Sequence, residues 1–256
     1  MKLRLPGHHE DDLMLSVPRG YRATVRWRPQ IGDIVPDFRA RGRGGAFRFH
    51  PFAEGHWVVL FSHPAAFTPI CSTELASLAA HGPEFEARDV RLLNVSADAP
   101  EQSAAWLADI EALFGVKISF PTVTDESGAL IRIFGMIHRK EDEACAIRKT
   151  FVIDPTLRIR AITEYPLVVG RSTDELLRLI DALQAAQIYN VGIPADWHPG
   201  DHAVQLPGQA PNLPGAAGTA QRVRPYLTVL DLSPSRAEAA DGLNAAPDRA
   251  TRRHVG

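Results

Sequence analysis

The residue with the clearest chemical potential is a cysteine that follows a strand-like apolar segment. Cys71 comes after the apolar residues 57–62 and a loop that contains Pro64 and Thr68. Only the thiolate form of cysteine is a strong nucleophile, and a helix N-terminus or nearby cations can lower a thiol pKa from about 8.5 to between roughly 3.5 and 7.5. A cysteine that enters a helix from such a loop therefore predicts a reactive thiolate.

The surrounding residues could meet the needs of a cysteine that reduces a peroxide. Thr68 supplies a hydroxyl that can bond to sulfur or peroxide, and Pro64 can shield the sulfur from water. The backbone N–H groups of Ile70 and Cys71 can donate to a developing anion at a helix start. We assign the missing cation to Arg148, because a guanidinium stays charged at any relevant pH and offers a planar fork of donors.

Composition excludes several other classes of protein. The chain has 256 residues, of which 45% are apolar and 23% charged, with a net charge of −2, as is ordinary for a soluble protein. We expect no nucleic-acid partner and no membrane partner, since no apolar run reaches the roughly 18 residues of a membrane helix. Acidic residues near the N-terminus argue against a signal peptide. Two cysteines cannot form a disulfide scaffold, so we expect a reducing, cytoplasmic location.

The chain is expected to divide into four parts. Residues 1–28 lack sustained periodicity and resemble an N-terminal extension, whereas the packed domain is expected over residues 29–190. Proline and glycine recur in the next segment, residues 191–233, which predicts a small C-terminal domain. The polar residues 234–256 predict a disordered tail.

Apolar periodicity and turn residues predict the order of the elements. The order is a strand at 57–62, a helix at 72–80, a strand at 90–95, helices at 100–114 and 127–134, a hairpin of strands 146–153 and 157–165, a helix at 173–186 and a strand at 223–232. Residues 41–45 are expected to form a solvated loop, and Ser172 with Glu175 has the spacing of a capping box. This order is typical of an α/β thioredoxin-like fold, a central mixed sheet flanked by helices.

The motifs around Cys71 resemble those of the peroxiredoxin family. Pro64-x-x-x-Thr68-x-x-Cys71 matches the family's active-site pattern, Glu74 follows as it commonly does there, and Arg148 begins a segment like the strand that carries the family's arginine. The resemblance extends to the one-cysteine peroxiredoxin 6 subfamily over about residues 30 to 232. Gly32 to Phe38 resembles the usual N-terminal entry of the family. The subfamily resemblance rests on the segments Arg48-Phe49-His50, Leu60-Phe61-Ser62-His63-Pro64, Tyr165-Pro166, Gly170-Arg171 and Pro194-Ala195-Asp196-Trp197.

The resemblance implies a thiol peroxidase, for which we expect no cofactor and no metal. Cys71 would attack hydrogen peroxide or an organic hydroperoxide and become a sulfenic acid, which an external thiol would reduce. Arg148 would stabilise the thiolate and the transition state, and Thr68 would orient the peroxide. His63 would lie beside the pocket, and Arg171 would support the region around Cys71.

The same resemblance implies a homodimer, in which residues 191–233 act as a dimerisation domain, and assemblies of several dimers are possible. Glutathione, thioredoxin and other thiol carriers all stay open as reductants, and the peroxide preference is also open. A rival hypothesis is a redox sensor or partner-binding protein that Cys71 oxidation switches without catalysis. A thioredoxin-like disulfide reductase is disfavoured because position 74 is Glu rather than the second cysteine of Cys-x-x-Cys.

Several of these residues also suit simpler roles. Cys71 alone would fit a small buried hydrophobe, although its matching neighbours favour a nucleophile. Thr68 also suits a turn or cap, His63 a hydrogen-bonded structural histidine, and Arg171 an ion pair at a helix entrance. If residues 145–153 form one strand, Cys145 and Arg148 point to opposite faces, which predicts a structural thiol at Cys145 unless a loop breaks the strand.

Two further activities are disfavoured. The histidines at positions 50, 56 and 63 match no standard zinc spacing, and a metal would block the thiolate. Some members of the subfamily are credited with phospholipase activity through a serine just before the tryptophan that corresponds to Trp57. Here that position is His56, so we expect no lipid hydrolysis.

Overall fold

The computed structural model describes residues 28–42, 45–142, 145–213 and 220–232. The chain divides into two compact units, residues 1–171 and 172–256. The expected N-terminal extension, apart from Arg28, and the expected tail lie outside the described residues. The domain boundaries expected from the sequence stay predictions.

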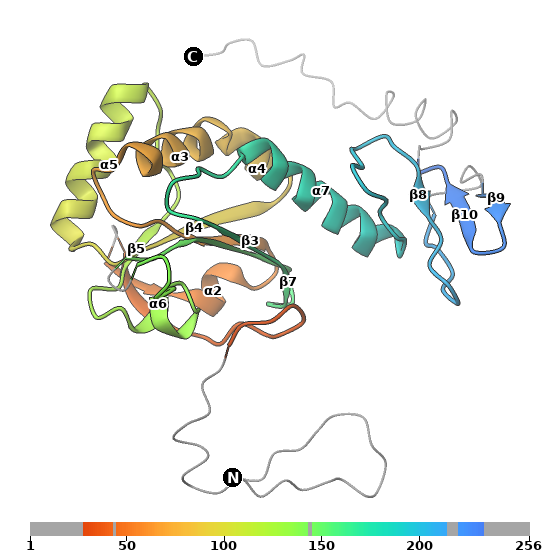
Figure 1. Ribbon diagram of the computed structural model, residues 1–256, viewed down its shortest axis with the longest axis horizontal. Coiled ribbons are helices and arrows are strands. Elements are labelled where there is room, and N and C mark those ends of the chain that lie inside the picture. Colours follow the sequence, from red (N-terminus) through yellow and green to blue (C-terminus); the bar gives the residue numbers. More distant parts are fainter. Residues whose placement is uncertain (1–27, 43–44, 143–144, 214–219, 233–256) are drawn as a thin grey trace, which may run out of the picture. The chain divides into compact units, whose positions relative to one another are not determined.

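The first unit is built around a seven-stranded mixed sheet (Figure 1). The strands are β1 (Arg39–Gly42), β2 (Gly45–Arg48), β3 (Trp57–Ser62), β4 (Val90–Ser96), β5 (Thr122–Thr124), β6 (Arg148–Ile153) and β7 (Ile159–Tyr165), in the spatial order β2-β1-β5-β4-β3-β6-β7. Strand β4 runs parallel to β3 and β5, whereas β6 is antiparallel to β3. The predicted thioredoxin-like fold with a central mixed sheet is confirmed.

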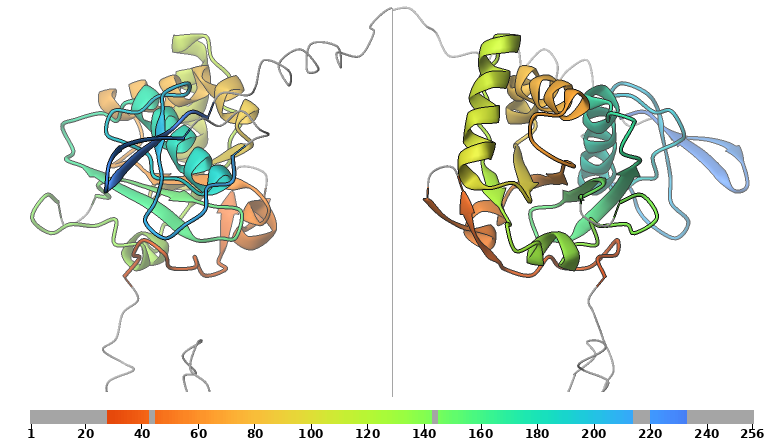
Figure 2. Two further views of the ribbon diagram at one scale, coloured as in Figure 1. Left: turned by 90° about the vertical axis from the view of Figure 1, so that its right-hand side faces the viewer. Right: turned by 60° about the vertical axis from the view of Figure 1, so that its left-hand side comes forward.

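Helices cover both faces of this sheet. They are α2 (Phe49–Ala53), α3 (Pro69–Ala80), α4 (Gly82–Ala87), α5 (Pro100–Phe114) and α6 (Ala129–Ile133). Helices α3, α4 and α5 lie on one face, and α2 and α6 lie on the other (Figures 1 and 2). Because β3 is covered on both sides, all six of its side chains are buried, as a continuous apolar run predicts.

The apolar core on the α2 and α6 side fixes the two central strands. Phe134, at the end of α6, contacts Phe151 of β6 edge-on, with 5.5 Å between ring centroids. Leu60 of β3 and Leu93 of β4 are fully buried in the same cluster. Each such side chain contributes about 1.5–3 kcal/mol by leaving water, so the ends of β3, β4 and β6 are held in fixed places.

Local signals set the helix boundaries. Pro100 occupies the first turn of α5 and Gly115 caps its end with a left-handed φ of 65°, and the predicted bounds of this helix are confirmed. Helix α3 begins at Pro69 rather than at Ser72, which brings Cys71 into its first turn. Proline is favoured there because its fixed φ suits the helix and its missing N–H is not needed.

The β1–β2 hairpin corrects part of the loop expected at residues 41–45. Arg41 and Gly42 end β1 and Gly45 begins β2, while residues 43–44 lie outside the described residues. These strands sit at one edge of the sheet. Their four-residue length gave too little apolar alternation for a strand to be predicted.

The second unit contains helix α7 (Thr173–Tyr189) and a three-stranded sheet in the order β8-β10-β9. The Ser172 side chain accepts from the Glu175 N–H at 3.2 Å, so the predicted cap is confirmed. The single strand expected at residues 223–232 is wrong. The chain instead forms β9 (Ala220–Arg224) and β10 (Leu227–Leu230), which pair with each other, while β10 also pairs with β8 (Ala203–Val204).

Candidate active site

Cys71 lies in the first turn of α3, just beyond the carboxyl end of β3, and its side chain is fully buried. The preceding Thr68 has an extended backbone, and because Pro69 has no N–H the first helical N–H group is that of Ile70. The dipole of a helix places partial positive charge at its N-terminus. An anion is therefore favoured in the turn that holds the sulfur.

Arg148 meets this sulfur from the start of β6. Its Nη1 donates to Cys71 Sγ at 3.3 Å across 77 residues of sequence. Its Nε and Nη2 both donate to the Leu167 carbonyl, at 3.1 and 2.8 Å. With two of its nitrogens fixed in this way and only 2% of its surface exposed, the guanidinium presents the third nitrogen to the cysteine in a fixed orientation. The structure thus brings the predicted nucleophile and cation together.

Glu74, one turn after Cys71, joins Arg148 to Arg171. Its Oε2 accepts from Arg148 Nη1 at 2.5 Å and from Arg171 Nη2 at 3.0 Å. Its Oε1 accepts from the backbone N and the Nε of Arg171 at 2.8 and 2.9 Å. One carboxylate beside two guanidiniums leaves an excess of positive charge, which a thiolate at Cys71 would balance.

The charge of Glu74 depends on these two arginines. Burial alone would raise the pKa of its carboxyl, but the charge and hydrogen bonds of Arg171, with the charge of Arg148, hold that pKa below its ordinary value of 4.5. A buried carboxylate that is fully paired in this way remains ionised at neutral pH. The cluster is therefore a rigid, charged support for the sulfur.

Arg171 itself is held against the sheet. Its Nη1 donates to Thr150 Oγ1 at 3.1 Å, and its guanidinium lies over the Phe61 ring, 5.2 Å from the centroid. The preceding Gly170 packs closely on α3, since a Cβ there would meet Ile70 Cγ2 at 3.3 Å. Arg171 therefore reaches the region of Cys71 through its contacts with Glu74.

Thr68 and Pro64 lie in the loop between β3 and α3. The Thr68 hydroxyl donates to the Ala65 carbonyl at 3.0 Å, while its own carbonyl accepts from the N–H and the hydroxyl of Ser72 at 3.0 and 2.8 Å. Because the hydroxyl proton is used inside the loop, the oxygen keeps lone pairs that can accept from a peroxide O–H.

His63 is fully engaged with groups on β4 and the residues after it. Its Nδ1 lies 3.0 Å from Asn94 Oδ1 and its Nε2 lies 3.3 Å from Asp98 Oδ2. Its ring contacts the Trp106 ring of α5 with centroids 4.8 Å apart. Both ring nitrogens thus already face a polar partner, which favours the structural alternative for this histidine.

Sequence reasoning missed Asn94, Ser96 and Asp98. A signal for them was present, because the three polar residues occupy alternate positions at and just beyond the carboxyl end of a buried strand. Residues at alternate positions of a strand lie on the same face. Strand β4 lies next to β3 in parallel register, so these side chains end beside His63.

Cys145 has different surroundings. Strand β6 begins at Arg148, so the assumption of one strand from residue 145 is wrong and the parity argument does not apply. The Cys145 N–H donates to Asp142 Oδ1 at 2.8 Å. Burial first, and then the negative charges of Asp142 and Asp98 with a smaller effect of Cys71, raise the pKa of the Cys145 thiol.

The histidines considered as metal ligands bond to different groups rather than to a shared site. His50 Nε2 contacts the Val35 carbonyl at 2.8 Å, and His56 Nδ1 contacts Asp89 Oδ1 at 2.7 Å. In the part of the chain that the structure describes, no group of three or more His, Cys, Asp or Glu residues is placed to hold a metal ion. Nor does any described helix have the length and apolarity to cross a membrane.

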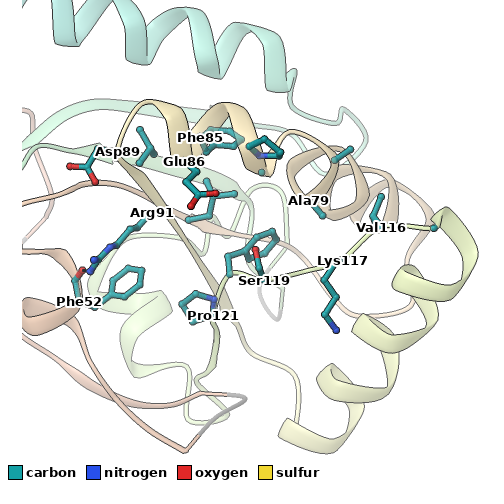
Figure 3. Close-up of a pocket in the computed structure, with 17 residues that line it drawn as sticks. Phe52, Ala79, Phe85, Glu86, Asp89, Arg91, Val116, Lys117, Ser119 and Pro121 are labelled. Atoms are coloured by element: carbon teal, nitrogen blue, oxygen red, sulfur yellow. Dashed lines mark hydrogen bonds between the residues drawn. The ribbon is translucent and has the colours of Figure 1, made fainter. Parts of the chain in front are cut away.

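A separate pocket of about 900 Å³ lies at the other end of β4 (Figure 3). Its lining includes Phe85 and Glu86 of α4, Arg91 of β4 and Lys117 of the loop after α5, and it includes none of the predicted site residues. Strand β4 begins at this pocket and ends beside His63. The pocket and Cys71 therefore lie at opposite ends of the parallel strands.

Known proteins share these features. A family model described as the AhpC/TSA family matches residues 31–162. The chain is 41% identical over 171 residues to a peroxiredoxin of Aquifex aeolicus, which covers 67% of this chain and 77% of that protein. It is 38% identical over 178 residues to a 1-Cys peroxiredoxin of Dictyostelium discoideum, covering 70% of this chain and 74% of that one.

Solved structures agree with the sequence relatives. The peroxiredoxin 6 of Arenicola marina matches with a TM-score of 0.72 and 31% identity over 80% of this chain and 99% of that one. A yeast mitochondrial 1-Cys peroxiredoxin matches with a TM-score of 0.71 and 33% identity over 79% of this chain and 99% of that one. The predicted resemblance to one-cysteine peroxiredoxins is confirmed.

Proposed function

Since the chain belongs to the AhpC/TSA family and is a thiol-dependent peroxidase, we propose that Cys71 is its peroxide-reducing residue and works by a one-cysteine mechanism. The observation that carries this assignment is the 3.3 Å contact between Arg148 Nη1 and Cys71 Sγ. The contact fixes a permanent cation on a buried sulfur at a helix start, which is the setting that favours a thiolate.

The first step is attack of the Cys71 thiolate on one peroxide oxygen. The S–O bond forms as the O–O bond breaks, and the departing oxygen leaves as hydroxide or alkoxide, which takes a proton to give water or alcohol. Sulfur is oxidised to the sulfenic acid and the peroxide is reduced. Arg148 stabilises the charge as it moves from sulfur to the leaving oxygen, and the Thr68 oxygen accepts the peroxide O–H.

An external thiol completes the cycle. A first thiol condenses with the Cys71 sulfenic acid, releasing water and leaving a mixed disulfide. A second thiol then displaces Cys71 as a thiolate and leaves as the disulfide of the reductant. Excess peroxide in place of the thiol would drive Cys71 to sulfinic acid.

Steady-state turnover separates this function from the rival redox sensor. We expect many equivalents of hydrogen peroxide and of an organic hydroperoxide to be consumed per chain when a suitable thiol is in excess. Cys71→Ser is expected to abolish the consumption. Oxidation of Cys71 that never proceeds to turnover with any thiol would favour the sensor.

The reductant is best sought with a panel of donors. In the yeast mitochondrial 1-Cys peroxiredoxin, the thiol is resolved via glutathione and thioredoxin systems. Glutathione alone, glutathione with glutaredoxin, and the thioredoxin system are therefore the first donors to compare for this chain. The peroxide preference follows from the same assay with hydrogen peroxide and bulky hydroperoxides.

We also propose a homodimer. Strand β7 forms one edge of the sheet, and an edge strand presents backbone groups that can pair with another chain. Light scattering during gel filtration is expected to give twice the chain mass of 28.0 kDa or a multiple of that dimer. A monomer at micromolar concentration would refute the proposal.

The cytoplasmic location stays a prediction, which fractionation of the source cells would test.

A further inference from the structure

We propose that Asp98 is a positioning residue of the peroxidase, a role that rests on the proposed function of Cys71. Asp98 fixes the loop of residues 63–68, which carries Pro64 and Thr68, in the shape that presents a peroxide to the sulfur. It does so without contact to the reacting atoms.

Three contacts converge on one oxygen of Asp98. Its Oδ2 accepts from the Ala66 N–H at 2.9 Å and from the Ser96 hydroxyl at 2.6 Å, and it lies 3.3 Å from His63 Nε2. Ala66 and His63 belong to the loop, whereas Ser96 ends β4. A single carboxylate oxygen therefore ties the loop to the strand next to β3.

Asp98 is suited to this role because it stays ionised. Its side chain is 12% exposed. Burial would raise its pKa, but the hydrogen bonds from His63 and Ser96 outweigh burial and lower it. An ionised carboxylate only accepts hydrogen bonds, and charged acceptors form the shorter and stronger ones. His63 faces this carboxylate through Nε2 at 3.3 Å, and its other ring nitrogen, Nδ1, lies 3.0 Å from Asn94 Oδ1.

The loop needs an anchor because Phe67, the residue after Ala66, has an unfavourable backbone φ angle. Phe67 has a left-handed φ of 56° and is 55% exposed, and a positive φ is a genuine outlier for a bulky side chain. Its neighbours hold it on both sides: Asp98 binds the N–H of Ala66, and Ser72 binds the carbonyl of Thr68. Such a conformation persists only where the surroundings determine it.

Loss of the Asp98 carboxylate removes the hydrogen bond that holds the Ala66 N–H. Phe67 can then relax to a negative φ, and this rotation shifts Thr68 relative to Cys71. The Arg148 contact is made from β6 and is untouched by such a shift. Misplacing a substrate-orienting group by about 1 Å costs on the order of 100-fold in rate. Peroxide reduction is therefore expected to suffer while the reactivity of the sulfur persists.

The test compares two reactions of Cys71 in wild type and Asp98→Ala. Stopped-flow oxidation by hydrogen peroxide depends on the loop, whereas alkylation by iodoacetamide needs only a thiolate that the reagent can reach. We expect Asp98→Ala to slow peroxide oxidation by roughly 10- to 100-fold with a much smaller change in alkylation. An unchanged ratio of the two rate constants in a folded variant would overturn the role.

Two further variants complete the design. Asp98→Glu keeps the charge but displaces the oxygen, so the same fall in the ratio is expected, and this variant decides the matter if Asp98→Ala does not fold. Asp89→Ala removes another aspartate that pairs with a histidine but is 66% exposed, and it should leave the ratio at the wild-type value. Slow peroxide oxidation of the wild type would instead refute the proposed function itself.

Discussion

The two cysteines of this chain show how surroundings decide the chemistry of a thiol. Cys71 is fully buried at the start of a helix, with Arg148 Nη1 3.3 Å from its sulfur. Cys145 lies in a loop beside Asp142, where burial and negative charge raise its thiol pKa. The same side chain is paired with a cation in one place and placed near carboxylates in the other. Residue type alone therefore does not indicate which of the two thiols to propose as the nucleophile.

The difference comes from groups far away in sequence. Glu74 holds Arg171 and Arg148 on the Cys71 side, across 97 and 74 residues. Asp142 contacts the Cys145 backbone from only three residues away. Long-range pairing thus supplies positive charge to one sulfur, whereas Asp142 in a local turn, together with Asp98, places negative charge near the other.

The largest effect on the rate of peroxide oxidation is expected from substitution of the cysteines themselves. Cys71→Ser should abolish rapid peroxide oxidation, since a hydroxyl is not ionised by these surroundings, whereas Cys145→Ser should leave the rate constant near that of wild type. Stopped-flow kinetics with hydrogen peroxide measure both. A large loss of rate in Cys145→Ser would make the second thiol part of the mechanism.

Removing the Arg148 cation is expected to cause the next largest loss of rate. Arg148→Met is expected to lower the rate constant for peroxide by roughly 100- to 1,000-fold, the usual cost of one lost transition-state donor. Arg148→Lys keeps the charge but not the planar fork that also holds the Leu167 carbonyl, so it should recover only part of the rate. Equal rates for wild type and Arg148→Met would separate the guanidinium from catalysis.

Substitution of Glu74 tests whether its buried carboxylate stabilises the two arginines beside Cys71. Glu74→Ala leaves two buried guanidiniums without their carboxylate and should lower the free energy of unfolding by about 3–5 kcal/mol. Urea denaturation followed by circular dichroism measures this change. Glu175, whose exposed carboxylate pairs with Arg178, is the matched control, and Glu175→Ala should cost no more than about 1 kcal/mol. Similar losses for the two variants would contradict the buried cluster.

The same carboxylate predicts a pH dependence. The pKa of Glu74 lies below its ordinary value of 4.5 in the folded chain, so its stabilisation is complete above that value and is lost as the pH falls through the lower folded pKa. The difference in melting temperature between wild type and Glu74→Gln should shrink over that range. A constant difference would show that the charge of Glu74 contributes nothing.

The smallest expected effect sharpens the comparison at Cys145. Asp142→Asn removes a negative charge that raises the Cys145 pKa, so more thiolate should form at neutral pH. Alkylation of Cys145, followed by mass spectrometry, should become faster by no more than about fivefold, equivalent to the roughly 1 kcal/mol of an exposed charge pair. Alkylation of Cys71 is the internal control and should not change.

The sequence predicted the parts of this molecule that local patterns determine. Pro100 and Gly115 mark both ends of α5, and the apolar run of β3 indicates a strand buried on both faces. The very short strands β1, β2 and β5 were missed because three or four residues carry too little periodicity. Their pairing comes from the sheet rather than from their own sequence.

The sequence indicated the residues of the candidate site and a contact between Arg148 and Cys71, but not the way in which Glu74 joins the two arginines. Cys71, Glu74 and Arg148 were each identified, largely because their motif resembles a known family. That one carboxylate would join two arginines was not predictable from spacing, since its partners lie 74 and 97 residues away in the sequence. Asp98 was missed because it lies beyond the end of β4, and only the pairing of β4 with β3 places it beside His63.

Trapping the oxidised sulfur tests the central claim most directly. One equivalent of hydrogen peroxide is added to the reduced wild-type chain together with dimedone, and mass spectrometry locates the sulfenic acid adduct. We predict one adduct per chain, on Cys71, present in wild type and Cys145→Ser and strongly reduced in Arg148→Met. An adduct that forms on Cys145 instead, or that forms on Cys71 equally well without Arg148, would contradict the account.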